Sequence, residues 1–377
     1  MRAEIAESIT DFSAREWNQL AGEQYPFLRH EFLAAAERTG SASAASGWIP
    51  RHIGLFDNSG RLSAALPLYE KSHSWGEFVF DWSWAHAYER AGLDYYPKLV
   101  STVPFTPATS GRLLAAGPDE ATALVETALA VARSNEVSSW HVLFPEADEL
   151  PVLEAAGLKL RKDCQFHWHN HDYADFDAFL ATFSSAKRKK ARRDRRRVAE
   201  QGITFRRFDG GTMDAARWQD VYELISMTFM RRGSLPYFSL DFFLEVSERL
   251  PDSLLVVAAM KQDAMIAAAV FYDTDDVLYG RYWGADGHYD ALHFETCYYQ
   301  GIDYCIERGR RRFEPGTQGE HKISRGFVPV NTWSAHWLAR PEFFSAIGQY
   351  LEAEARHIDH YVDAVNQHVP YKRSSDG

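Results

Sequence analysis

The sequence has few cysteines and no long apolar run. Its 377 residues include three cysteines, none of them in a CxxC pair. An odd, small number argues against a disulfide framework and is typical of a reducing compartment. No stretch of about 18 apolar residues occurs, and the N-terminus lacks a basic region followed by an apolar one. We therefore expect a cytoplasmic chain without membrane insertion.

Several catalytic motifs are also missing. The sequence contains no GxSxG, HExxH, GxxxxGK[ST] or GxGxxG, which excludes the simplest hydrolase, zinc protease, P-loop and dinucleotide-binding sites. Ser184 and Lys187 form an SxxK match of only four letters, which we interpret as accidental. His167, His169 and His171 alternate along an expected strand and share one face. No acid or cysteine at matched spacing completes a metal site, so we expect no metal and a polar wall between domains.

What the chain does contain is material for packed cores. Hydrophobic residues make up 46%, aromatic residues 14% and charged residues 25%, a composition that predicts folding throughout. The length exceeds that of a usual single core. We therefore expect two domains, residues 1–160 and 161–377.

The first half alternates strand-like and helix-like segments. Residues 48–56 and 61–69 predict a hairpin around the turn DNSG. Residues 77–84 predict a third extended run, and the proline-rich stretch 95–107 predicts a shaped loop that lines a cleft. Helical spacing over residues 120–135 precedes another strand.

The second half repeats this order. An apolar helical stripe begins at Phe176, and the basic run that follows is expected to continue the same helix. Three strands over residues 254–283, a helix over 292–308 and a strand over 312–314 come next. An antiparallel meander, a helix and a further strand predict an α+β fold in both halves.

One basic segment stands out in a chain with a net charge of −11. Lys187–Arg197 (KRKKARRDRRR) holds nine basic residues against one acid, within an expected helix over 185–200. Like charges at helical spacing destabilise a helix by a few tenths of a kcal/mol per pair. This helix could be a solvated face, a phosphate clamp or a contact to a tRNA acceptor arm. The candidate anion contacts are Arg188, Lys189 and Arg192.

The densest group of chemical side chains lies in a loop over residues 315–327. After Pro315, its sequence GTQGEHKISRGF (residues 316–327) places Glu320, His321, Lys322 and Arg325 among glycines. Amide formation needs a base for the amine and a cation for the developing oxyanion. We predict Glu320 or His321 as the base, and Lys322 and Arg325 as charge stabilisers. A merely solvated loop is the alternative.

Further candidates are spread over both halves. The first half offers polar and aromatic side chains that suit a pocket, of which Glu77 and Asp81 are the best acceptor-binding candidates. Glu295, on the helix before the loop, is the base to consider if neither loop residue serves. The remaining polar and aromatic residues of the first half are Lys71, His73, Trp84, Tyr88, Tyr95, Tyr96, Lys98 and Arg112.

The chain resembles the FemAB-like family of predicted N-acyltransferases, a branch of the GNAT superfamily related to the Fem-type aminoacyltransferases that build peptidoglycan bridges in bacteria. The resemblance implies two tandem GNAT-like domains with mixed, mostly antiparallel sheets flanked by helices. It rests on segments spread over nearly the whole chain: residues 67–84, 95–99, 104–107, 166–170, 185–197, 293–306 and 316–329.

In a GNAT acyltransferase a pyrophosphate loop follows the fourth strand, and RYWGADG at residues 281–287 stands at that place. Arg281 and Gly284 match part of the pattern RxxGx[GA], which suggests donor binding at a helix N-terminus. Asp286 replaces the expected small residue, and a carboxylate is unfavourable beside pyrophosphate. An ordinary strand-to-helix turn is the alternative.

The predicted activity is transfer of an acyl group from an activated carrier to an amine acceptor, directly and with general-base assistance. The expected donor is acyl-CoA, and the alternative is an aminoacyl-tRNA held through the basic helix, as in Fem-like enzymes. A non-catalytic protein that binds RNA or an envelope precursor is a second alternative.

Overall fold

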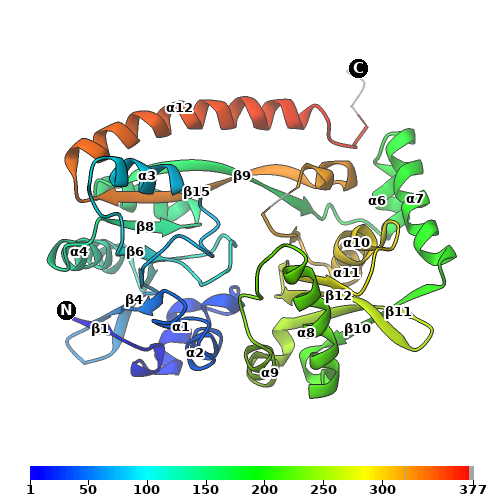
Figure 1. The fold of residues 1–377 in the computed structure, drawn as a ribbon, viewed down its shortest axis with the longest axis horizontal. Coiled ribbons are helices and arrows are strands. Elements are labelled where there is room, and N and C mark those ends of the chain that lie inside the picture. The colour runs from blue at the N-terminus through cyan, green and yellow to red at the C-terminus, as the bar shows by residue number, and fades with distance from the viewer. Residues whose placement is uncertain (318, 373–377) are drawn as a thin grey trace. The chain divides into compact units, whose positions relative to one another are not determined.

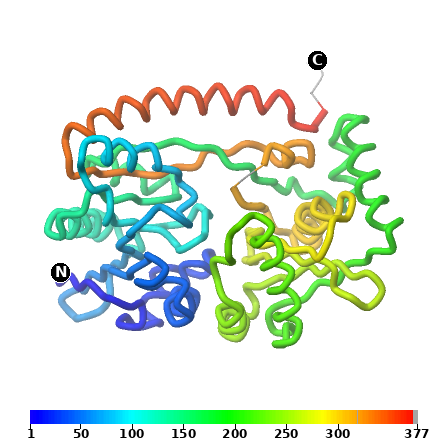
Figure 2. Tube along the Cα trace, viewed as in Figure 1, coloured from blue at the N-terminus to red at the C-terminus, as the bar shows by residue number. Residues whose placement is uncertain are grey.

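The computed structural model describes residues 1–317 and 319–372, and the chain divides into two compact units. Unit 1 comprises residues 1–164 and 331–360, and unit 2 comprises 165–330 and the residues from 361 onward. The chain leaves unit 1 within strand β9 and returns within β15 (Figure 2). This division differs from the expected 1–160 and 161–377, because β15 comes back to pair with β8 of unit 1.

Unit 1 contains antiparallel hairpins and a parallel pair. Its strands form the orders β1-β3-β4-β7 and β15-β8-β6-β5-β2, and helix α4 packs on β3, β4 and β7 through Leu124, Ala128 and Leu129. The elements are β1 (Arg2–Ala6), α1 (Ala14–Ala21), α2 (His30–Arg38), β2 (Trp48–Pro50), β3 (His52–Phe56), β4 (Leu62–Leu66), β5 (Tyr69–Lys71), α3 (Trp82–Arg90), β6 (Lys98–Ser101), β7 (Leu114–Ala115), α4 (Pro118–Ser134), β8 (Ser139–Leu143), α5 (Leu150–Ala155), β9 (Lys159–His169) and β15 (Val328–Leu338).

Two local predictions in unit 1 are wrong. The expected extended run over residues 77–84 is an irregular loop followed by helix α3. Trp84 and Tyr88 are both buried, four positions apart, so α3 has one aromatic face. The expected loop over residues 95–107 contains strand β6, which pairs in parallel with β8. The predicted hairpin does form, with Ile53 opposite Leu66.

Unit 2 contains one mixed sheet with strand order β10-β11-β12-β13-β14-β9. All of its neighbouring pairs are antiparallel except β13 and β14, which are parallel. With its helices this gives the expected α+β architecture (Figure 1). The elements are α6 (Phe176–Ala181), α7 (Ser185–Glu200), β10 (Ile203–Asp209), α8 (Ala215–Met230), α9 (Leu240–Arg249), β11 (Leu254–Lys261), β12 (Ala264–Asp273), β13 (Val277–Ala285), α10 (Leu292–Phe294), a π-helical segment (Glu295–Tyr299), α11 (Gln300–Arg308), β14 (Arg312–Glu314), a 3-10 helix (Glu320–Arg325) and α12 (Pro341–Asn366), of which residues 341–360 belong to unit 1.

The expected continuation of the apolar helix into the basic run is wrong. Helix α6 ends at Ala181 and α7 starts at Ser185. Between them Phe183 bridges to Tyr371, and the backbone N–H of Ser184 donates to the carbonyl of Pro370 at 2.8 Å. The chain therefore makes one sheet-like contact before the basic helix begins.

At strand β13 the sheet of unit 2 has helices packed on both of its faces. The strand's alternating side chains point to opposite faces: Tyr282 contacts Phe243 of α9, whereas Trp283 contacts His293 of α10. The pairing with β14 stops at Tyr279 opposite Glu314. Strand β13 continues along β12 to Ala285, whereas β14 ends at Glu314, so the loop after β14 begins beside Gly280 of β13.

No helix among residues 1–317 and 319–372 combines the length and apolar character of a membrane span.

Candidate functional site

The loop after β14 is built around a compact 3-10 helix, Glu320–Arg325. Gly319 before it has a φ of 110°, in the region that glycine adopts without strain. A Cβ at Gly319 would lie 2.1 Å from Cε1 of His321. Glycine at this position is therefore what lets the imidazole fold over the start of the loop.

His321 contacts the π-helical segment Glu295–Tyr299 through Tyr298. The Tyr298 hydroxyl is hydrogen-bonded to Nε2 of His321 at 2.8 Å, and the rings of His293 and Phe294 are close by. Burial, together with the charges of Arg325 and Lys322, lowers the pKa of His321 below 6.5. The ring is therefore neutral at pH 7 and can accept a proton.

Lys322 is a buried amine, 1% exposed, and no carboxylate of the described residues forms an ion pair with it. Its Nζ donates to the carbonyl of Gly316. Burial, reinforced by the positive charge of Arg281, lowers the pKa of Lys322 to about 7, although Cys297 acts in the opposite direction. Protonated and neutral forms of this amine are therefore comparably populated at neutral pH.

Arg325 is buried, and its guanidinium already interacts with other residues of unit 2. Its Nη1 donates to the carbonyl of His321, and its guanidinium lies 3.4 Å from the centre of the Phe294 ring. Asp194 of α7 is 3.6 Å from Nη2. These contacts hold the turn of the loop and supply the counter-charge that a buried cation requires.

The other candidate bases differ in their surroundings. Glu320 is exposed, and its Oε1 accepts a hydrogen bond from Tyr361 at 2.9 Å. Glu295 is buried in the π-helical segment, where its Oε1 accepts from Arg195 at 3.2 Å and from Gln300 at 2.8 Å. Burial raises the pKa of Glu295. The structure thus brings His321, Lys322 and Arg325 together, pairs the Glu320 carboxylate with Tyr361 and gives Glu295 an ion pair.

The expected turn over residues 281–287 does not form there, because Arg281 and Gly284 lie within β13. A Cβ at Gly284 would approach the carbonyl carbon of Leu224 to 2.1 Å, so this glycine serves the close packing of α8 on the strand. In the pairing with β12, Tyr282 lies opposite Val270 and Gly280 opposite Phe271. Arg281 is therefore the extra residue of a β-bulge, a feature that is common beside active sites.

Helix α7 carries the basic residues and packs beside the site (Figure 1). Two ion pairs on its inner face join it to other elements of unit 2: Asp194 pairs with Arg325, and Arg195 pairs with Glu295 and Asp303. Arg192 is exposed and forms a surface ion pair with Asp177 at 2.9 Å. Within the described residues, the cations of α7 with no ion pair are Lys187, Arg188, Lys189, Lys190 and Arg193.

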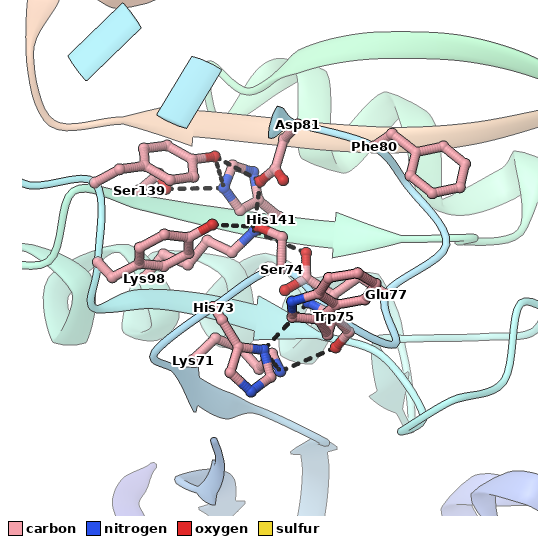
Figure 3. A network of polar contacts seen from close by, with 12 residues as sticks. Lys71, His73, Ser74, Trp75, Glu77, Phe80, Asp81, Lys98, Ser139 and His141 are labelled. Atoms are coloured by element: carbon pink, nitrogen blue, oxygen red, sulfur yellow. Dashed lines mark hydrogen bonds and ion pairs between the residues drawn. The ribbon is translucent and has the colours of Figure 1, made fainter. Parts of the chain in front are cut away.

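Unit 1 holds a separate buried charge cluster around Lys98 (Figure 3). Nζ of Lys98 donates to Glu77 at 2.7 Å, to Ser74 at 2.8 Å and to Asp81. The Tyr95 hydroxyl donates to Asp81 at 2.6 Å. Burial raises the pKa of Glu77 to about 7. Burial is also the largest single influence at Asp81, but the charge of Lys98, His141 and the hydrogen bonds from Lys98 and Tyr95 together outweigh it and hold the pKa of Asp81 at about 2. Glu77 and Asp81 therefore serve a paired network in which Lys98 is the centre.

The network continues to two histidines. Nδ1 of His141 is 2.7 Å from Nδ1 of His336, and Ser139 is hydrogen-bonded to Nε2 of His141 at 2.8 Å. Burial lowers the pKa of His141 to about 3, so the pair is neutral. Lys71, also buried, has a pKa lowered by burial to about 7 and lies over the Trp48 ring.

Sequence reasoning did not select Tyr298, His293 or Lys98 as site residues. Tyr298 has the spacing of a core position, and only its hydroxyl contact reveals a second role. Lys98 lies 21 residues from Glu77, a separation with no periodic signature. Its place directly before buried strand residues was the available signal, because a lysine there has to find acidic partners.

The His167, His169 and His171 stretch lies at the end of β9 and beyond it. His167 is buried, 3.9 Å from Glu314. Among residues 1–317 and 319–372, no group of three or more His, Cys, Asp or Glu residues is placed to hold a metal ion.

A family model described as FemAB-like, peptidoglycan biosynthesis/recognition, matches residues 8–373. No curated protein matches the chain with significance. Among solved structures, one titled FemX has a TM-score of 0.55 at 11% identity and covers 92% of this chain and 100% of its own. The C-terminal domain of a putative lysylphosphatidylglycerol synthetase from Agrobacterium fabrum gives 0.55 at 11%, covering 90% and 96%. The L-PGS of Bacillus licheniformis gives 0.51 at 12%, covering 85% and 96%. These likenesses establish the fold, two tandem GNAT-like domains.

Proposed function

Because the chain belongs to the FemAB-like family and is a transferase of acyl or aminoacyl groups, we propose that unit 2 transfers an aminoacyl group from a charged tRNA to an amine. The observation that carries this choice of donor is helix α7. One face is tied to the site loop through Asp194, and five of its cations have no ion pair in the described residues. Such a helix suits a polyanion next to the chemistry.

The basic run is costly unless a ligand uses it. Lys187 and Arg188 lie in the first turn of α7, where the helix dipole disfavours cations. Each close pair of like charges adds a few tenths of a kcal/mol. Phosphates of a nucleic acid would offset both terms by direct ionic contact and counterion release.

The coenzyme A alternative has less support from the geometry. The residues expected to form a pyrophosphate turn belong to β13, where Gly284 packs against α8. The connection to α10 carries Asp286 and Asp290 instead, and carboxylates are unfavourable beside a pyrophosphate.

In the proposed reaction the acceptor amine attacks the ester carbonyl that joins the amino acid to the tRNA ribose. A C–N bond forms, the ester C–O bond breaks, and the ribose oxygen leaves with a proton. Neutral His321, oriented by Tyr298, takes the proton from the attacking amine. Protonated Lys322 stabilises the developing oxyanion, and Arg325 positions the loop. Glu320 is the alternative base.

The test compares donors directly. Purified protein is given an amine acceptor with either charged tRNA or acyl-CoA, and amide product and free thiol are measured with and without RNase. The proposal predicts amide formation that RNase abolishes. Thiol release that is insensitive to RNase would establish acyl-CoA as the donor, and RNA binding without turnover would indicate a binding protein.

A charge-reversal pair assigns the donor contact to α7. The double variant Arg188→Glu, Lys189→Glu should raise the Kd for tRNA. The slope of log K against log salt concentration should become shallower by an amount that corresponds to about two lost phosphate contacts. Arg249→Glu on α9 is the control, because it changes net charge away from α7. Unchanged affinity in the double variant would show that α7 is a solvated face.

A further inference from the structure

We propose that Asp194 and Arg195 of α7 are positioning residues for the transfer: one holds the catalytic loop and the other holds the π-helical segment, each at a fixed place against the basic helix. The inference rests on the proposed function for the identity of the donor, but its test measures the rate of the chemical step. Neither residue contacts a reacting group.

Asp194 is the only acid within the basic run Lys187–Arg197, and the structure shows why it is there. It lies on the buried face of α7 with Ala191 and Val198. Its carboxylate is 3.6 Å from the guanidinium of Arg325, which in turn donates to the carbonyl of His321. The buried acid therefore supplies the counter-charge for the residue that shapes the catalytic turn.

Arg195, the next residue, reaches the other wall of the site. Its Nη2 is 2.7 Å from Asp303 of α11, and its Nε is 3.2 Å from Glu295 in the π-helical segment. The guanidinium also lies 4.2 Å from the centre of the Phe176 ring. A planar, bidentate cation with an aromatic contact is held in one orientation. Tyr298, the hydroxyl partner of His321, belongs to that same π-helical segment.

Adjacent residues of opposite charge thus join one helix to both halves of the His321–Tyr298 hydrogen bond. Loss of either ion pair frees one of the two partners. Because misplacement by about 1 Å costs up to 10²-fold in rate, the expected defect is in the chemical step and not in donor binding.

The electrostatic consequence is specific as well. The groups that face His321 are Arg325 and Lys322 on its own loop, and His293 and Tyr298 on the adjoining helix. Removal of the Asp194 charge leaves Arg325 uncompensated, and this lowers the pKa of His321 further. The acid limb of the pH–rate profile should therefore move to lower pH, a change that a loss of fold would not produce.

The experiment measures single-turnover rates at saturating charged tRNA, tRNA affinity and the pH–rate profile for Asp194→Asn and Arg195→Lys. We expect rates about 10- to 100-fold lower, a Kd within about twofold of wild type, and an acid limb shifted downward for Asp194→Asn only. Asp177→Asn is the matched control. It removes the acid of α6 that pairs with Arg192, and Arg192 lies on the exposed face of α7.

Arg195→Lys keeps the charge and serves if Asp194→Asn fails to fold. Wild-type single-turnover rates in either folded variant, or a rate loss matched by Asp177→Asn, would overturn the proposal. A loss of tRNA binding in both variants with an unchanged rate at saturation would do so too. If acyl-CoA proves to be the donor, the same rate and pH readouts apply with that substrate, so failure of the donor assignment is separable.

Discussion

Lys98 of unit 1 and Lys322 of unit 2 are both buried amines, yet their surroundings are opposite. Lys98 donates to Glu77, Asp81 and Ser74, and these carboxylates outweigh burial and raise its pKa. Lys322 donates only to a backbone carbonyl among the described residues, and burial, reinforced by the charge of Arg281, lowers its pKa to about 7. A buried cation with acidic partners fixes structure, whereas one without them is poised to change its charge.

The largest expected effect removes the base beside Lys322. His321→Asn should lower the single-turnover rate by about 10² to 10⁴ with tRNA affinity and thermal stability unchanged, because the ring is partly exposed and neutral. Glu320→Gln serves as the matched test of the neighbouring carboxylate. A loss confined to Glu320→Gln would move the base to that residue, and wild-type rates in both would place the chemistry outside this loop.

The second prediction concerns Lys98, which is paired with Glu77 and Asp81. Lys98→Met should lower the free energy of unfolding by about 3–5 kcal/mol, because it leaves Glu77 and Asp81 buried without their cation. Denaturant unfolding measures this loss. Lys322→Met, the matched variant of unit 2, should leave stability near wild type but reduce the rate. Equal stability losses in the two variants would erase the distinction between them.

A pH–rate profile sharpens the comparison on the side of unit 2. The rate should rise as His321 loses its proton below pH 6.5 and fall as Lys322 loses its proton at about pH 7. Lys322→Arg keeps the charge at higher pH and should remove the alkaline limb, with roughly a tenfold gain over wild type at pH 8 relative to each enzyme's maximum. An alkaline limb that persists in Lys322→Arg would assign it to another group.

The smallest expected effects come from two tyrosine hydroxyls that each meet a histidine. Tyr95→Phe removes the donor to Asp81 and a contact to His141, and should cost about 1–2 kcal/mol of stability with little effect on rate. Tyr298→Phe should lower the rate several-fold, because His321 loses its orienting contact. Thermal unfolding and turnover on both variants test the pair, and a rate defect in Tyr95→Phe alone would contradict the assignment.

The sequence predicted elements whose signal is local. The meander over residues 254–283 follows from apolar runs bounded by turns. The first residues of helix α3 were assigned to the extended run over residues 77–84 because aromatic residues favour extended structure, whereas burial of Trp84 and Tyr88 along one helical face decides the outcome. In α3, side-chain packing therefore outweighs the intrinsic strand propensity of the aromatic residues.

The site was predictable only in part, for the same reason. Charged residues crowded among glycines identified the loop around His321, since four chemical groups in six positions are visible in sequence. The Lys98 cluster, the Asp194–Arg325 ion pair and the Tyr298–His321 hydrogen bond join residues far apart in the chain. Gly284 was misinterpreted because a tight turn and a close helix contact both require a residue without a Cβ.

The most direct test of the difference between the two lysines is to titrate them. NMR of the side-chain ammonium groups in ¹⁵N-lysine-labelled protein, with Lys98→Met and Lys322→Met spectra for assignment, reports each protonation state from pH 5.5 to 9. The account predicts that Lys322 loses its proton near pH 7 while Lys98 stays protonated throughout. A Lys322 that remains protonated up to pH 9 would contradict it.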